Sequence, residues 1–177
     1  MRKAVMISIR PKWCEKIARG EKTIEVRKSR PKLETPFKCY IYQTKNGKAE
    51  PELIIAYGKI CGRKNVNGGT VIGEFICTDF VPFCNGKPIL MTRKETVEEI
   101  ERRSCLSREQ ILEYEPKGNP IGWCISDLVI YDKPKDLSDF RLYYCSVVQE
   151  NGYPIPTHEI RRPPQSWCYV EEVQSDG

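Results

Sequence analysis

The sequence predicts an α+β fold: a small β-barrel of about six strands, with short helices at its ends and an irregular, proline-rich C-terminal extension. Runs of β-branched and aromatic residues, bounded by turn residues, recur along most of the chain and indicate well-separated strands. One helical pattern interrupts them early, between the first two strands. Strands of this length, with a helix inserted early, are typical of a small mixed or closed barrel.

The first elements are a strand, a helix and a second strand. Residues 5–9 form an apolar run that is typical of a buried strand. Pro11 suits the first turn of a helix, and an apolar stripe at helical spacing begins at Trp13. Gly20 is a natural end for this helix, because glycine adopts the left-handed conformation without strain. A polar strand is then expected from about 22 to 28.

The middle of the chain contains the remaining strands and two polar helices. Strands are expected over 37–42, 53–60, 70–81 and 121–131, a turn over 63–69, and helices over 95–103 and from 107 onward. The 70–81 strand is expected to kink at Gly73, which lacks a side chain. Ser107 begins the last helix with a capping-box spacing, since Gln110 follows three residues later.

Beyond Lys133 the prolines become dense, and proline blocks both sheet ladders and helix interiors. We therefore divide the chain into a domain over residues 1–132 and an extension over residues 133–177. The extension is expected to pack irregularly along the barrel of the same domain, pinned there by Trp167 and Tyr169.

Composition narrows the class of protein. The chain of 177 residues, 30% charged and 40% hydrophobic, fits one globular domain with a decorated tail. No apolar run approaches the ~20 residues of a membrane helix. The apolar run near the N-terminus is too short and too alternating for a signal peptide. We expect a cytoplasmic protein with no membrane partner. Nothing in the sequence indicates an oligomeric state.

The nine cysteines have no spacing that predicts a site. Their number is odd, no Cys-x-x-Cys occurs, and His158 is the one histidine of the chain. This pattern argues against a disulfide framework and against zinc. Most of the cysteines lie in strand-like apolar runs and are interpreted as small buried hydrophobic residues. We expect no metal and no cofactor.

Positive charge is concentrated at the start of the chain. Residues 1–32 contain eleven Lys and Arg against three Glu, a net +8, whereas residues 33–177 carry a net −3. This asymmetry predicts a phosphate-bearing partner, either RNA or a nucleotide. The alternative is a solvated basic face. Candidate phosphate contacts outside the motif described next are Arg10, Lys12, Arg63 and Lys64.

A polar motif, Gly-Glu-Lys-Thr-Ile-Glu-Val-Arg at residues 20–27, lies inside this basic region. If it forms a strand, Thr23, Glu25 and Arg27 share one face and Lys22 lies at the turn before it. A hydroxyl, a carboxylate and a guanidinium in one row, beside an amine, are typical of the wall of a polar pocket.

The motif residues suit both recognition and catalysis. Glu25 would accept hydrogen bonds from a base edge, such as a cytosine amine, and Arg27 would bind a phosphate or carbonyl through two donors. Lys22, if burial and the neighbouring guanidinium keep its amine neutral, would act as a base or nucleophile. The structural alternative is an ion pair between Glu25 and Arg27 on one strand face, with Lys22 in solvent. The residues alone leave both interpretations open.

The motif Gly-x-Lys-x-x-Glu-x-Arg at residues 20–27, directly after a strand and a helix, resembles the signature of the ASCH domain of the PUA-like superfamily. The strand over 122–128 also resembles the closing strand of that fold. The resemblance covers residues 4–132. It implies a PUA-like β-barrel with a cleft beside the first helix, lined by the motif, and binding of RNA or a modified nucleoside.

The resemblance also implies an alternative activity. Small bacterial amidohydrolases with a similar fold cleave N4-acetylcytidine through a Lys-x-x-Thr arrangement and a distal glutamate. Lys22 matches the lysine, but Glu25 occupies the position of the threonine, and Thr23 is the nearest hydroxyl. Glu99 and Glu101 are candidates for the distal glutamate. In this reading the catalytic residues are Lys22, Thr23 and Glu25.

Overall fold

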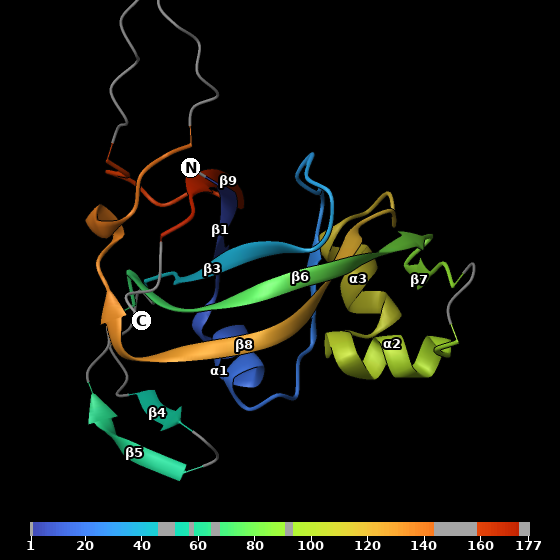
Figure 1. Ribbon diagram of the computed structural model, residues 1–177. Coiled ribbons are helices and arrows are strands. Elements are labelled where there is room, and N and C mark those ends of the chain that lie inside the picture. The colour runs from blue at the N-terminus through green and yellow to red at the C-terminus, as the bar shows by residue number, and fades with distance from the viewer. Residues whose placement is uncertain are drawn as a thin grey trace, which may run out of the picture.

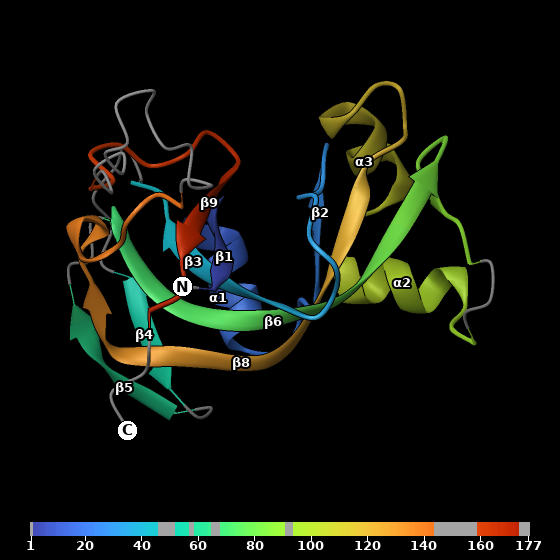
Figure 2. The ribbon, with the colours of Figure 1, turned by 45° about the horizontal axis from the view of Figure 1, so that its top comes forward.

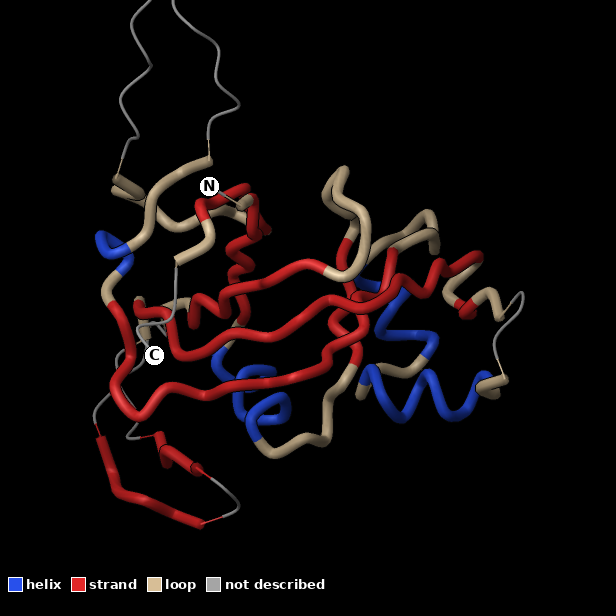
Figure 3. Tube along the Cα trace, in the orientation of Figure 1, coloured by secondary structure: helices blue, strands red, loops and turns tan. Residues whose placement is uncertain are grey.

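In the computed structural model, the chain forms a seven-stranded sheet with three α-helices, which confirms the predicted α+β class (Figure 1). The structure describes residues 2–45, 52–56, 59–64, 68–90, 94–143 and 159–173. The helices α2 and α3 lie together at one end of the sheet, whereas α1 lies near its middle (Figures 1 and 3). No helix of the described residues is long and apolar enough to span a membrane.

The elements follow one another along the chain with these bounds. The strands are β1 (Lys3–Ile9), β2 (Ile24–Arg27), β3 (Phe37–Gln43), β4 (Glu52–Ala56), β5 (Lys59–Lys64), β6 (Thr70–Cys84), β7 (Lys87–Pro88), β8 (Ile121–Lys135) and β9 (Trp167–Glu171). The helices are α1 (Pro11–Ala18), α2 (Val97–Ser104), α3 (Arg108–Tyr114) and a short 3-10 turn, η1 (Leu137–Asp139).

Local chemistry accounts for the helix ends. A proline occupies the start of α1, and Gly20, just beyond its end, has the positive φ of 73° that favours glycine. The helix α2 begins with a capping box in which Thr96 and Glu99 each bind the backbone N–H of the other. Ser107 and Gln110 form the predicted capping box of α3. Each helix therefore begins or ends where the sequence indicates.

The main sheet has the strand order β2-β8-β6-β3-β1-β9, and β7 adds to β6. The strands β1 and β3 are parallel, and every other described pair is antiparallel. The strands β6 and β8 are the longest and bend together along an arc (Figure 2). The irregularity near Gly73 agrees with the predicted kink, since the β6–β8 register shifts between Val71 and Gly73. A Cβ atom on Gly73 would lie 2.3 Å from the carbonyl oxygen of Val129.

The predicted β-barrel is wrong, because the sheet is open. In the described part of the chain, the end strands β2 and β9 form no backbone ladder with each other. Side chains bridge the two ends instead. The Arg27 side chain of β2 donates to the Ser8 carbonyl of β1 at 2.5 Å, and the Trp167 indole of β9 donates to the Ser29 hydroxyl at 3.2 Å. The strand β2 ends at Arg27, and the chain then enters a loop that contains Pro31.

A separate hairpin replaces the single strand expected over 53–60. The strands β4 and β5 pair antiparallel and form their own two-stranded sheet. The sequence has a glycine at position 58, which weakens a continuous strand. The turn expected to hold Arg63 and Lys64 is also wrong, since both residues belong to β5. Their side chains lie outside the described part of the structure.

The C-terminal segment forms a regular strand, whereas the sequence predicted an irregular extension. Residues 167–171 contain aromatic and β-branched residues without proline and form β9, which pairs antiparallel with β1. Trp167 and Tyr169 pack against the main core cluster. The boundary expected after residue 132 falls within β8. The segment 159–173 thus completes the sheet.

The core consists of three buried clusters, one of them between α1 and the sheet. At its centre Trp123 is fully buried. Four of the described cysteines are buried, as expected of small hydrophobic residues. These four are Cys14, Cys39, Cys77 and Cys124.

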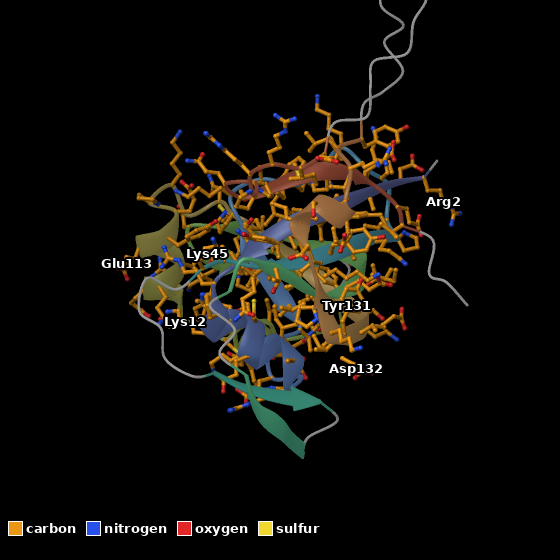
Figure 4. All side chains as sticks on the ribbon, turned by 90° about the vertical axis from the view of Figure 1, so that its left-hand side faces the viewer. Arg2, Lys12, Lys45, Glu113, Tyr131 and Asp132 are labelled. Carbon is orange, nitrogen blue, oxygen red and sulfur yellow. The ribbon has the colours of Figure 1, made fainter. Side chains whose placement is uncertain are left out.

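A polar cluster joins β3, β6 and β8. Glu74 accepts hydrogen bonds from the Tyr131 hydroxyl and from the Lys38 ammonium, the latter at 2.9 Å. Figure 4 labels Tyr131 on β8. Burial alone would raise the pKa of Glu74, but these hydrogen bonds and the charge of Lys38 outweigh burial and lower it. Burial and the same carboxylate raise the pKa of Tyr131.

The lowered pKa of Glu74 predicts a loss of stability in acid. A carboxyl whose pKa is lower in the folded state stabilises the protein above its unfolded pKa of about 4.3, and this contribution is lost as the pH falls through the folded value. We expect the urea midpoint of the Glu74→Gln variant to fall less between pH 6 and pH 3 than that of the wild type. The control is Glu113→Gln at an exposed site, which should keep the wild-type profile. Equal profiles for all three proteins would contradict the assignment.

Candidate functional site

The charged residues of the polar motif lie inside the protein. Lys22 is 2% exposed, Glu25 5% and Arg27 8%. All four residues of β2 are buried, because β8 pairs with the strand and α2 contacts it. The strand therefore has no open polar face, and the structural alternative with Lys22 in solvent is wrong.

One carboxylate lies between two cations in this interior. Glu25 Oε2 lies 3.4 Å from Lys22 Nζ, and Glu25 Oε1 lies 3.1 Å from Arg27 Nη2. We call Lys22, Glu25 and Arg27 the buried ion network. The network carries a net charge of +1, so the N–H donors of Lys22 and Arg27 that Glu25 does not bind need other acceptors.

Backbone carbonyls at both ends of the network are these acceptors. Lys22 Nζ donates to the Ser104 carbonyl at 2.5 Å, and Arg27 Nη2 donates to the Ser8 carbonyl at 2.5 Å. Ser104 is the last residue of α2, where carbonyls lack partners within the helix and the helix dipole favours a positive charge. The network thus connects the end of α2 to β1 through β2.

The loop before β2 is held by α1. The Lys22 backbone N–H donates to the Lys16 carbonyl at 3.1 Å, and the Glu21 N–H donates to the same oxygen at 2.9 Å. Gly20 allows the turn that makes these bonds possible. This arrangement turns the Lys22 side chain toward the interior, where its ammonium lies 5.0 Å from the centre of the Trp13 ring.

Thr23 does not join the network, although the sequence predicted that it shares a face with Glu25 and Arg27. Its hydroxyl accepts from Arg103 Nε at 2.9 Å, and its backbone N–H donates to the Arg103 carbonyl at 2.9 Å. The regular strand begins only at Ile24, so strand alternation does not extend back to position 23. The threonine holds α2 in place beside the network.

Three buried polar atoms near the network retain hydrogen-bonding capacity. Glu25 Oε2, Arg27 Nε and Trp123 Nε1 have no hydrogen-bond partner among the described residues. Glu25 and Trp123 are opposite one another in the β2–β8 pairing. Buried donors and acceptors without partners destabilise a fold, so such atoms are candidates for ligand contacts. One acceptor and two donors are available here.

The other candidates from the sequence lie elsewhere. Arg10 and Lys12 are exposed at the start of α1, and the Lys12 ammonium lies 4.6 Å from the Trp13 ring centre (Figure 4). Glu99 serves the capping box of α2, and Glu101 lies in the same helix, partly buried. The structure therefore brings together Lys22, Glu25 and Arg27, whereas the basic side chains of Arg10 and Lys12 lie at the surface.

Sequence reasoning missed the partners of the network. Ser8 and Ser104 contribute backbone carbonyls, which no side-chain pattern in the sequence could indicate. Trp123 carried no signal either, since only the β2–β8 pairing brings it here. Within the described ranges, no group of three or more His, Cys, Asp and Glu could hold a metal ion.

Comparisons with known proteins agree with the fold. The crystal structure of ASCH from Zymomonas mobilis has a TM-score of 0.58 and 17% identity, covering 96% of this chain and 88% of that chain. Two variants of that protein give the same TM-score. A tyrosine-to-phenylalanine variant is 19% identical over 97% of this chain and 92% of its own, and a serine-to-alanine variant is 18% identical over 97% and 90%.

At these identities the structures support the fold alone. A search of curated proteins found no match. The model of the ASCH domain family matches residues 7–150, which is most of the sequence. This match shows that the chain belongs to the ASCH domain family.

Proposed function

We propose that this ASCH domain binds RNA, or a modified nucleoside or nucleotide, at the buried ion network without turning it over. One observation carries the proposal: the Glu25 carboxylate and the Arg27 guanidinium lie side by side, and each keeps one atom without a hydrogen-bond partner among the described residues. A nucleobase edge presents donors and acceptors side by side, which is the complementary arrangement.

The network is suited to recognition because its groups are already oriented. Lys22 and Arg27 hold the carboxylate from both sides, so little side-chain entropy would be lost on binding. A ligand that lacks the matching groups would leave Glu25 Oε2 and Arg27 Nε without a hydrogen-bond partner, and this penalty provides discrimination. The Glu25 and Arg27 side chains are only 7% and 10% exposed, so entry requires the side chains that cover them to move.

Exposed basic side chains close to the network would bind the phosphates of such a ligand. Arg10 and Lys12 follow Ser8 by two and four residues, and Ser8 accepts the hydrogen bond from Arg27. Phosphate contacts position a nucleic acid and make its affinity depend on salt. The predicted partner, RNA or a nucleotide, and the predicted cytoplasmic location both follow from the sequence and belong to this proposal.

The test is a salt titration of binding to fluorescently labelled short RNAs. We expect Lys12→Ala to weaken binding and to reduce the slope of log K against log salt by about 0.7, the value for one phosphate contact on a single strand. Lys133→Ala, at an exposed site of β8, is the matched control and should keep the wild-type slope. Absence of binding at low salt, both to RNA and to free nucleosides in a thermal-shift assay, would overturn the proposal.

The second candidate is an amidohydrolase that acts on N4-acetylcytidine or a similar acylated nucleoside, with Lys22 as base or nucleophile. Burial of a lysine within 3.4 Å of a carboxylate favours it. Against it, the Lys22 amine is engaged by Ser104 and Glu25, and the Thr23 hydroxyl is engaged by Arg103. Release of acetate that Lys22→Ala abolishes would support the enzyme, and no turnover across a panel of acylated nucleosides would exclude it.

A further inference from the structure

A row of aromatic rings leads from the buried ion network to the protein surface. Trp123, opposite Glu25, contacts Phe80 at 5.9 Å and Trp167 at 6.1 Å between ring centres, and Trp167 contacts Tyr169 at 5.4 Å. Trp123 is fully buried, whereas Phe80, Trp167 and Tyr169 are half-buried. We call these four residues the aromatic row.

Cations lie over the outer rings of the row. Arg30 lies 5.1 Å from the Phe80 ring centre, and Lys3 Nζ lies 4.7 Å from that of Tyr169. These positions join positive charge to aromatic faces at both ends of the row. Asp79, the residue before Phe80 in the sequence, carries a negative charge, opposite to that of Arg30.

The loop between β2 and β3 is attached to the same row. Its residues 28–32 include three exposed basic side chains, of which Lys28 forms an ion pair with Glu115. Two hydrogen bonds to side chains of β9 hold the loop: Ser29 accepts from the Trp167 indole at 3.2 Å, and the Lys32 N–H donates to the Tyr169 hydroxyl at 2.7 Å. This loop directly follows Arg27, so basic charge continues from the network along the row.

We propose that the loop 28–32 and the outer rings of the aromatic row form a second binding surface, which takes the nucleotides that flank the one held at the network in a single strand. The exposed parts of the half-buried rings provide contacts for unpaired bases, and the exposed Arg30 and Lys32 provide phosphate contacts. A duplex would present no free base faces to these rings. The inference rests on the proposed function and adds that the ligand is a polymer.

The test compares binding of a labelled eight-nucleotide single strand with binding of mononucleotides to the full chain. Phe80→Leu removes the ring but keeps apolar packing, and Arg30→Ala removes an exposed cation. We expect Phe80→Leu to weaken oligonucleotide binding about fivefold or more, the lower range for loss of one stacked base, and Arg30→Ala to reduce the salt slope by about 0.7. Neither variant should alter mononucleotide binding.

The control is Val129→Ala, because Val129 is an exposed apolar residue of β8 that belongs neither to the aromatic row nor to the loop 28–32. It should bind the oligonucleotide as the wild type does. Trp167→Phe, which keeps a ring but loses the bond to Ser29, carries the test if Phe80→Leu does not fold, and it should weaken oligonucleotide binding alone.

Two outcomes overturn the inference and leave the proposed function standing: equal affinity for mononucleotide and oligonucleotide, or wild-type oligonucleotide affinity in the Phe80→Leu and Arg30→Ala variants while Lys12→Ala weakens binding. Equal competition by heparin, a polyanion without bases, would show that charge alone is recognised and would also overturn it. Absence of all binding would overturn both proposals together.

Discussion

Replacing Glu25 with alanine is expected to lower the free energy of unfolding by about 3–5 kcal/mol, the range for removal of one partner from a buried ion pair. The change leaves Lys22 and Arg27 buried without their shared counter-charge, and the two cations then repel one another. Their remaining acceptors, the carbonyls of Ser104 and Ser8, are neutral. Equilibrium unfolding in urea measures the loss.

Glu21→Ala is the matched control for this prediction. Glu21 also lies between two cations, Lys16 and Arg19, but all three side chains are more than a third exposed. Exposed pairs contribute about 0–1 kcal/mol, so this variant should unfold almost as the wild type does. Similar losses for Glu21→Ala and Glu25→Ala would contradict the distinction between exposed and buried charges.

An apolar replacement of the whole network separates its structural role from its functional one. The triple variant Lys22→Met, Glu25→Leu, Arg27→Met removes all three buried charges together and should retain most of the stability that Glu25→Ala loses, since well-packed apolar groups often replace buried ion pairs at little cost. If the network recognises a ligand, the triple variant should fold and fail to bind. Retained binding by the folded triple variant would count against the proposed site.

The second large effect is expected for Trp123→Ala, at about 3–5 kcal/mol, the range for truncation of a buried aromatic residue. Trp123 is fully buried, and its ring contacts Phe37, Phe80 and Trp167 on three other strands. Removal of the ring would leave a cavity where β3, β6 and β9 meet β8. The measurement is the urea midpoint together with the slope of the transition.

Trp123→Phe is the matched variant for this site. It keeps an aromatic ring and removes Nε1, which has no hydrogen-bond partner among the described residues, so no protein hydrogen bond is lost. We therefore expect a clearly smaller destabilisation than for alanine. Equal destabilisation by phenylalanine and alanine would contradict the expectation that an aromatic ring at this position retains most of the packing.

Short-range patterns predicted much of the fold. The apolar run of β1, the proline and glycine that flank α1, and the capping box of α3 each depend on residues close together in the sequence. The irregularity at Gly73 was predictable for the same reason. The strand β9 was missed because nearby prolines masked a five-residue strand whose partner, β1, lies at the other end of the chain.

The motif indicated which charged residues make up the candidate site, and the sequence alone determined that Lys22, Glu25 and Arg27 belong together in its most basic region. Only the tertiary structure decided that they are buried, that Thr23 turns away from them, and that Ser104, 82 residues from Lys22, completes the network. The physical reason is that spacing along a strand is a local property, whereas burial and hydrogen-bond partners depend on segments brought together by folding.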